Sequence, residues 1–70
     1  MKMSARNVLK GKVKKVSHGA VNSEVIVGLL HGYEIVSVIT KAAAESLNLN
    51  EGKEVYAIID AAHVMLATDY

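Results

Sequence analysis

Four residues near the start of the chain, Ser4-Ala5-Arg6-Asn7, include three side chains that donate hydrogen bonds. They offer a hydroxyl, a guanidinium and an amide, and the first carboxylate along the chain is Glu24. A cluster of donors suits a small, fully deprotonated anion, because such a ligand accepts hydrogen bonds and returns none. The alternative is that Ser4 and Asn7 shape the start of a strand while Arg6 points into water.

These donors need a framework, and the pattern of apolar residues predicts five strands and one helix. His18-Gly19 and His31-Gly32 mark turns, and Thr40 is a candidate N-cap residue for an alanine-rich helix. The order of elements, β-β-β-α-β-β, is that of an all-β, OB-like five-stranded Greek-key barrel with one short helix. The expected strands span residues 8–17, 20–30, 33–40, 53–60 and 63–68, and the expected helix spans residues 41–49.

Seventy residues form one small domain, residues 1–70. A chain of this length buries only about 60% of the surface that its unfolded form exposes, so a single core is marginal without reinforcement. Cysteine is absent, which excludes disulfides and thiolate metal sites, and the three histidines are too far apart for a zinc pattern. Because 51% of the residues are nevertheless hydrophobic, we expect an obligate homo-oligomer that buries apolar surface between subunits.

Charge is distributed unevenly along the chain. Residues 1–23 carry six cations and no acid, whereas residues 24–70 carry two cations and seven acids. A basic segment of this kind can attract phosphate backbones or small anions. The alternative is a strand at the edge of a sheet, where lysines discourage aggregation with other edges.

The sequence lacks the residue combinations of most catalytic sites. It has no nucleophile paired with a base, no carboxylates placed for acid–base chemistry and no glycine-rich loop for phosphate, so we do not expect an enzyme. No apolar run is long enough for a membrane span or a signal peptide, and we expect a cytoplasmic protein without a membrane partner. An OB-type nucleic-acid module is an alternative, but Phe and Trp are absent and the three tyrosines are dispersed, which leaves few stacking platforms.

The opening segment, residues 4–13, resembles the signature of the molbindins, the Mop family of small molybdate-binding proteins. The resemblance continues through residues 36–40, 47–52 and 64–66, and so covers nearly the whole chain. It implies an OB-like fold and a homohexamer built as a trimer of dimers, with oxyanion sites between subunits. The implied ligand is molybdate or tungstate, bound without an organic cofactor and without any metal ligated directly by side chains. The implied role is molybdenum storage or homeostasis.

The resemblance also implies the residues of the site. Ser4 and Arg6 correspond to the family's oxyanion-binding pair, with the N–H of Ala5 beside them and Asn7 completing the donor cluster. Thr40 occupies the position of a hydroxyl residue at the end of the third strand. The family has a second type of site, built largely from backbone near an oligomer axis. The turn Gly19-Ala20-Val21 is our candidate for it, with His18 as a turn residue beside it.

One junction departs from the family's pattern, which places a Lys and then a Ser where this chain has Asp60-Ala61. A carboxylate that pointed into the site would oppose a dianion by on the order of several kcal/mol at short range. Two interpretations follow. Either oxyanion binding is weakened here, which leaves a structural oligomer as a further alternative, or Asp60 turns away and Lys41 supplies the positive charge.

The nature of the donors bears on which anion would be bound. Molybdate and tungstate are tetrahedral dianions that carry no proton at neutral pH. A pocket of N–H and O–H groups without an acceptor disfavours protonated phosphate, which needs a place for its own hydrogen. Discrimination against sulfate must instead come from the size of the pocket.

Overall fold

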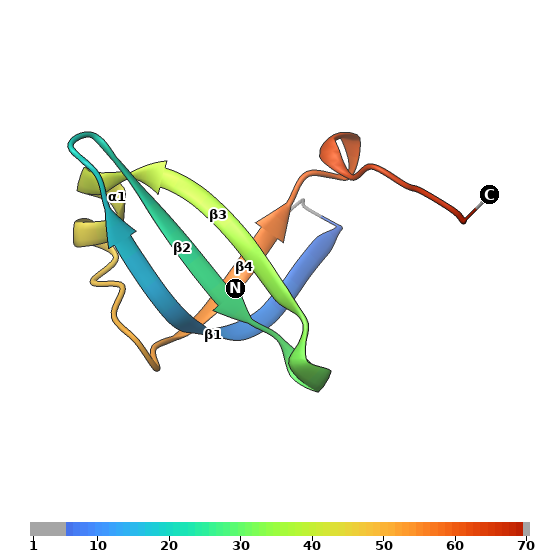
Figure 1. Cartoon of the computed structure of the whole chain (residues 1–70), viewed down its shortest axis with the longest axis horizontal. Coiled ribbons are helices and arrows are strands. Elements are labelled where there is room, and N and C mark those ends of the chain that lie inside the picture. Colours follow the sequence, from blue (N-terminus) through green and yellow to red (C-terminus); the bar gives the residue numbers. More distant parts are fainter. Residues whose placement is uncertain (1–5, 70) are drawn as a thin grey trace.

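The computed structural model describes residues 6–69 and shows one curled antiparallel sheet with a short helix at one end (Figure 1). The strand order in the sheet is β3-β2-β1-β4. The elements are β1 (Asn7–His18), β2 (Asn22–Gly28), β3 (Glu34–Thr40), α1 (Lys41–Ser46) and β4 (Glu54–Ile59), with 3-10 turns at Leu30–Gly32 and Ala61–His63.

Strand β1 is long enough to belong to both halves of the sheet. Its first half pairs with β4, from Asn7 to Lys12, and its second half pairs with β2, from Lys12 to His18. A register shift between Val13 and Lys15 inserts an extra residue into β1, and such a bulge increases the local twist. The strand also requires glycine at position 11, because a Cβ atom there would lie 2.5 Å from the carbonyl oxygen of Gly28. These features let the sheet coil toward a barrel.

The core of the single chain is small. Val13, Val25 and Val27 are at most 5% exposed, and half-buried apolar side chains from β1, β3, β4 and two loops pack around them. Ala44 is the buried residue that α1 contributes. Among residues 6–69, more large hydrophobic side chains are exposed than are buried. The small core agrees with the expectation that one chain cannot bury its apolar surface alone.

Helix α1 begins where expected and ends earlier. The Thr40 hydroxyl oxygen accepts a hydrogen bond from the backbone N–H of Ala43 at 3.1 Å, so Thr40 is the N-cap. The helix ends at Ser46, before the expected residue 49, because Asn48 takes a left-handed conformation with φ of 55°. The N–H groups of Asn48 and Leu49 then bond back to the carbonyls of Glu45 and Ala44. None of the helices within residues 6–69 has the length and apolar character needed to span a membrane.

The fold class is confirmed, and one element is corrected. The protein is mostly β with one short helix and an OB-like curl, but the predicted strand over residues 63–68 does not form. The chain makes a 3-10 turn at Ala61–His63, and residues 64–69 run on without strand pairing. The prediction was wrong because the segment has strand-type residues but pairs with no strand within residues 6–69. We call residues 64–69 the tail.

Candidate functional site

The predicted donors that the structure describes lie at one end of the sheet, which we call the tail end. Ser4 and Ala5 fall outside the described residues. Arg6 is exposed, and Asn7 is half-buried as the first residue of β1, where it pairs with Ile59 of β4. Arg6 directly precedes Asn7 in the chain and Asp60 directly follows Ile59, so both charged residues adjoin this pair. The cation of the predicted site therefore shares its end of the sheet with the carboxylate that departs from the family's pattern.

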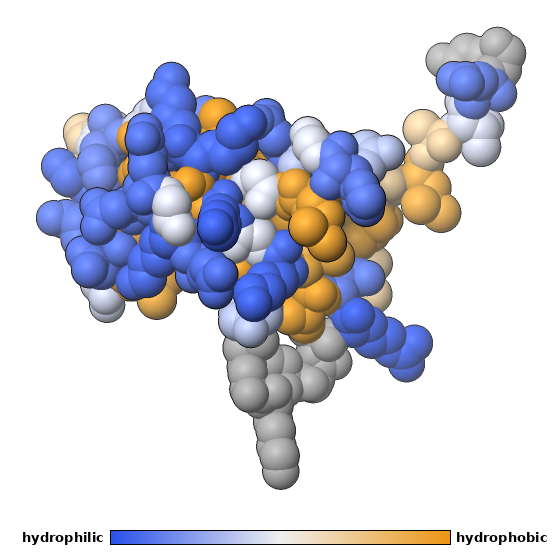
Figure 2. Space-filling model, turned by 90° about the horizontal axis from the view of Figure 1, so that it is seen from below, coloured by the Kyte–Doolittle hydropathy of each residue, from blue (hydrophilic) through white to orange (hydrophobic). Residues whose placement is uncertain are grey.

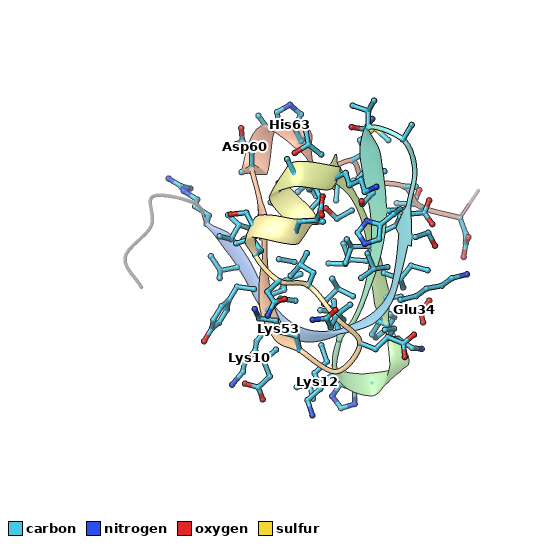
Figure 3. All side chains as sticks on the ribbon, turned by 90° about the vertical axis from the view of Figure 1, so that its left-hand side faces the viewer. Lys10, Lys12, Glu34, Lys53, Asp60 and His63 are labelled. Carbon is cyan, nitrogen blue, oxygen red and sulfur yellow. The ribbon has the colours of Figure 1, made fainter. Side chains whose placement is uncertain are left out.

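The Asp60 carboxylate makes local contacts. One oxygen accepts a hydrogen bond from the backbone N–H of Ala62 at 3.2 Å, and the other lies 3.4 Å from Nδ1 of His63. Figure 3 shows Asp60 and His63 together on the turn that follows β4. The Asp60 side chain is 68% exposed, so water screens its charge. Asp60 therefore caps the 3-10 turn, and Ala61 is the first residue of that turn.

Thr40 and Lys41 lie at the other end of the sheet, which we call the helix end. The backbone N–H of Lys41 donates to the carbonyl of Val21 at 2.7 Å, and Thr40 pairs with Asn22 across the ladder. Lys41 is half-buried. The Thr40 hydroxyl accepts from Ala43 through its oxygen, which leaves its own hydrogen free to donate to a ligand.

The helix end also holds the second predicted site. Gly19, Ala20 and Val21 form the exposed turn between β1 and β2, directly beside Thr40 and Lys41. The amide of Gly19 donates to the carbonyl of Asn22 at 2.7 Å, which closes the turn. The structure thus brings together residues that the sequence had assigned to two separate sites.

A polar contact that the sequence did not predict braces this turn. Nδ1 of His18 lies 2.6 Å from the hydroxyl oxygen of Ser23, and Ser23 is only 1% exposed. The two residues are paired across β1 and β2, which follows from the register of the hairpin and not from either residue alone. His18 is therefore the last residue of β1 and holds the base of the turn.

The two halves of the first predicted site are separated in one chain. Asn7 begins the 12-residue strand β1, and the turn beside Thr40 follows the end of that strand at His18. Figure 1 shows the start of β1 and the end of β4 on one side, with α1 and the β1–β2 turn on the other. A site that uses both Arg6 and Thr40 therefore requires two chains.

A groove of about 560 Å³ lies away from both ends and was not predicted. Lysines of β1 line it together with Leu29, Leu30 and Tyr33. Two of these lysines face carboxylates: Lys14 contacts Glu34 at 2.5 Å, and Lys10 lies 3.8 Å from Glu54. With its charge partly balanced and a single aromatic side chain in its lining, the groove offers little of what a nucleic-acid surface uses.

The described part of the chain holds no cluster of side chains that could ligate a metal ion directly. Within residues 6–69, no three His, Cys, Asp or Glu side chains gather closely enough to hold a metal ion. The candidate site is instead made of hydrogen-bond donors: the guanidinium of Arg6, the hydroxyl of Thr40, the ammonium group of Lys41 and amides of the β1–β2 turn. Such groups can hold an anion but carry out no chemistry on it.

Comparison with known proteins places this arrangement among small molybdenum-binding proteins. The TOBE domain family matches residues 3–66. A probable molybdenum-pterin-binding protein of Haemophilus influenzae is 46% identical over 69 residues, which cover 99% of this chain and 100% of that protein. These matches confirm the resemblance that the opening segment indicated.

Two solved structures share the fold. MopII from Clostridium pasteurianum superposes with a TM-score of 0.91 at 37% identity, over 96% of this chain and 100% of that one. ModG, described as a cytoplasmic molybdate-binding protein and solved with molybdate bound, superposes with a TM-score of 0.84 at 46% identity. That match covers 87% of this chain and 43% of ModG, so this chain spans less than half of ModG.

Proposed function

We propose that this chain binds molybdate without changing it chemically. The chain belongs to the TOBE domain family and, within it, to the Mop-type molybdenum-binding proteins. The family has a binding role and not a catalytic one. The observation that carries the proposal is the similarity along the whole chain to relatives that are named for molybdenum or molybdate. In this proposal residues 1–70 act as one oxyanion-binding domain.

The site we propose lies between subunits of a homo-oligomer. Arg6, with Asn7 and the preceding Ser4 and Ala5, would come from the tail end of one chain. Thr40 and Lys41 would come from the helix end of another. This arrangement is supported by the separation of the two ends in one chain and by the exposed hydrophobic side chains. A hexamer built as a trimer of dimers is the assembly that the family resemblance implies.

The donors suit molybdate and tungstate equally. Arg6 and Lys41 would provide charge-assisted hydrogen bonds, and Thr40 would donate through its hydroxyl. The Asp60 carboxylate opposes binding weakly, because it is exposed and occupied by its contacts with Ala62 and His63. Of the two interpretations of the Asp60-Ala61 junction, we therefore favour the one in which Asp60 turns away from the site and Lys41 supplies the positive charge.

A second oxyanion position is proposed at the β1–β2 turn. The amide of Gly19 is engaged in closing the turn, which leaves the amides of Ala20 and Val21 as the donors for a ligand. Both residues are exposed and stand beside Lys41, whose charge would favour an anion there.

In the cell we propose a role in molybdenum storage or homeostasis in the cytoplasm. The similarity to ModG, described as cytoplasmic, supports this placement. Several relatives are named for a molybdenum-pterin compound, whereas our proposal takes the bare oxyanion as the ligand.

Isothermal titration of the ligand-free full-length chain tests the proposal. Molybdate and tungstate should give saturable heat, and sulfate and a short single-stranded oligonucleotide should not. Binding of the oligonucleotide alone would favour the nucleic-acid alternative. Absence of heat with every ligand would leave a structural oligomer and would overturn the proposed function.

A further inference from the structure

The groove of about 560 Å³ lies outside both proposed oxyanion positions and has two unlike walls. One wall is formed by lysines of β1, and the other is formed by Leu29, Leu30 and Tyr33 of the turn between β2 and β3. Sites for small organic ligands usually have volumes of about 300–1,000 Å³ and are mostly apolar with a few charged groups. Figure 2 shows the side of the molecule on which this turn lies, where hydrophobic residues adjoin hydrophilic ones. The groove therefore has the size and the composition of a small-molecule site.

The apolar wall stands on a turn that its own backbone closes. The N–H of Leu29 donates to the carbonyl of Tyr33 at 2.7 Å, and His31 and Gly32 take left-handed conformations with φ of 65° and 81°. Leu30 is 80% exposed and Tyr33 is 71% exposed. Large apolar side chains that a closed turn holds in water form a surface that a ligand can cover, and the ring of Tyr33 can stack on a flat partner.

Glycine at position 28 leaves room in the groove. A Cβ atom there would lie 2.9 Å from Cδ of Lys14, so a side chain would displace the stem of this lysine. Gly11 and Gly32 also belong to the lining. Backbone therefore lines the groove at three places where side chains would otherwise fill it, and such places allow a ligand to approach closely.

The charged groups around the groove leave one positive charge unbalanced. Lys14 contacts Glu34. Lys10 lies 3.8 Å from Glu54. Lys12 lies between these two lysines on β1 and forms no ion pair with any of residues 6–69. Figure 3 shows Lys10 and Lys12 projecting on the same side of the sheet. The ammonium group of Lys12 is therefore the one that can bind an anion.

We propose that this groove binds a small organic anion with a flat ring system and a single negative charge. The ring would lie against Tyr33 and Leu30, and the anionic group would bind the ammonium group of Lys12. The carboxylates of Glu34 and Glu54 disfavour a polyanion such as a nucleic acid. The groove contains none of the residues assigned to molybdate, so the inference goes beyond the proposed function.

The ion 2-naphthoate is a suitable probe, because it has one flat ring system and one negative charge. Titration of the isotope-labelled full-length chain should give saturable shifts of the amide NMR signals of residues 10–14 and 28–33. The neutral 2-naphthamide should bind about fivefold more weakly, and added salt should weaken the binding of 2-naphthoate only. Shifts confined to other residues, or equal affinity for the two probes, would overturn the inference.

Two variants separate the contributions of charge and ring. Lys12→Met keeps the apolar stem and should weaken 2-naphthoate binding about fivefold. Lys15→Met is its matched control, since Lys15 is an exposed lysine of β1 outside the lining. Tyr33→Leu should weaken binding about threefold through loss of the ring, and Tyr56→Leu changes an exposed tyrosine outside the lining. If Lys12→Met and Tyr33→Leu bind the probe as their controls do, the groove is not the site.

Two further measurements distinguish other occupants. Saturating molybdate should leave the affinity for 2-naphthoate unchanged, and displacement of the probe would assign it to an oxyanion site and overturn the inference. Light scattering should give the same mass for Tyr33→Leu as for the unaltered chain. A lower mass would mean that a second copy of the chain covers the groove, which would also overturn the inference. A chain that binds 2-naphthoate but no molybdate refutes only the proposed function.

Discussion

The two ends of the sheet differ in how much of their structure one chain supplies. At the helix end, the hydroxyl of Thr40 caps α1, the backbone of Lys41 is bonded to Val21, and Ser23 and Ala44 are buried. At the tail end, Arg6 and every residue of 60–69 are exposed, and within residues 6–69 the side-chain hydrogen bond and ion pair of this segment are the local ones that Asp60 makes. The helix end is therefore packed and hydrogen-bonded within one chain, whereas the described part of the tail end is not.

This difference indicates a division of roles between the ends. The helix end is stabilised by its own packing, so it can hold Thr40 and Lys41 in place before a ligand arrives. The tail end contributes little to the stability of a single chain but carries Arg6 and the apolar tail. Substitutions at the tail end should therefore change binding and assembly with little effect on folding stability, whereas substitutions at the buried and capping positions of the helix end should change folding stability.

The largest effect is expected for Arg6→Gln. Hydrogen bonds to charged groups contribute about 1.5–3 kcal/mol, so molybdate affinity should fall about tenfold to hundredfold. The thermal midpoint should be unchanged, because Arg6 is exposed. Titration calorimetry and thermal denaturation measure the two quantities. Lys12→Gln is the matched control, since it removes the same charge from an exposed residue of β1 and should leave affinity unaffected.

Ala44→Leu should have the opposite effect, lowering the stability of the fold and leaving molybdate affinity unchanged. Ala44 is 1% exposed, and overpacking a buried position costs about 1–3 kcal/mol of unfolding free energy, which urea denaturation would measure. Ala42→Leu changes an exposed position of the same helix and should alter stability by less than about 0.5 kcal/mol. Equal effects at the two positions would mean that α1 is not packed as described.

Thr40 is the one residue for which both properties should change. Thr40→Ala removes the N-cap, which costs about 1 kcal/mol of stability, and it also removes the hydroxyl that we assign to the ligand. Thr40→Ser keeps both functions and should restore stability and molybdate affinity. If Thr40→Ala loses stability but keeps full affinity, the hydroxyl does not contact the oxyanion.

The smallest effect is expected for Asp60→Lys combined with Ala61→Ser, which installs the residue types common in the family. Exposed charges interact by about 0.2–1 kcal/mol, so affinity should rise by no more than about fivefold, and the gain should shrink as salt is added. Asp69→Lys makes the same change of charge farther along the tail and serves as the control. Unchanged affinity for the Asp60 and Ala61 pair would mean that this junction has no bearing on the site.

Local patterns account for most of the elements that the sequence predicted. The alternation over residues 8–17 matches β1 at Asn7–His18, and Thr40 is the N-cap as expected. The fifth strand was wrong because strand formation depends on a partner, and residues 63–68 have none in the part of the chain that the structure describes. A 3-10 turn capped by Asp60 follows from a short-range rule for aspartate in turns, which the sequence analysis did not apply.

The candidate site was predictable as a set of residues but not as an arrangement. The donor types around Arg6 indicated an anion, and the family resemblance assigned Arg6 and Thr40 to one site. That they lie at opposite ends follows from the registers of β1 with β4 and of β2 with β3, which no local pattern reveals. The proximity of Thr40 to Gly19–Val21 depends on the same pairing.

The most direct test of a site shared between chains is complementation of two defective variants. One chain carries Arg6→Gln, the other carries Thr40→Val with Lys41→Gln, and equilibrium dialysis counts molybdate sites after the two are refolded together. If each site takes one half from each of two chains, random mixing should restore about a quarter of the original sites at full affinity, although neither variant has any alone. A mixture that binds no more than the average of its two components would contradict the account.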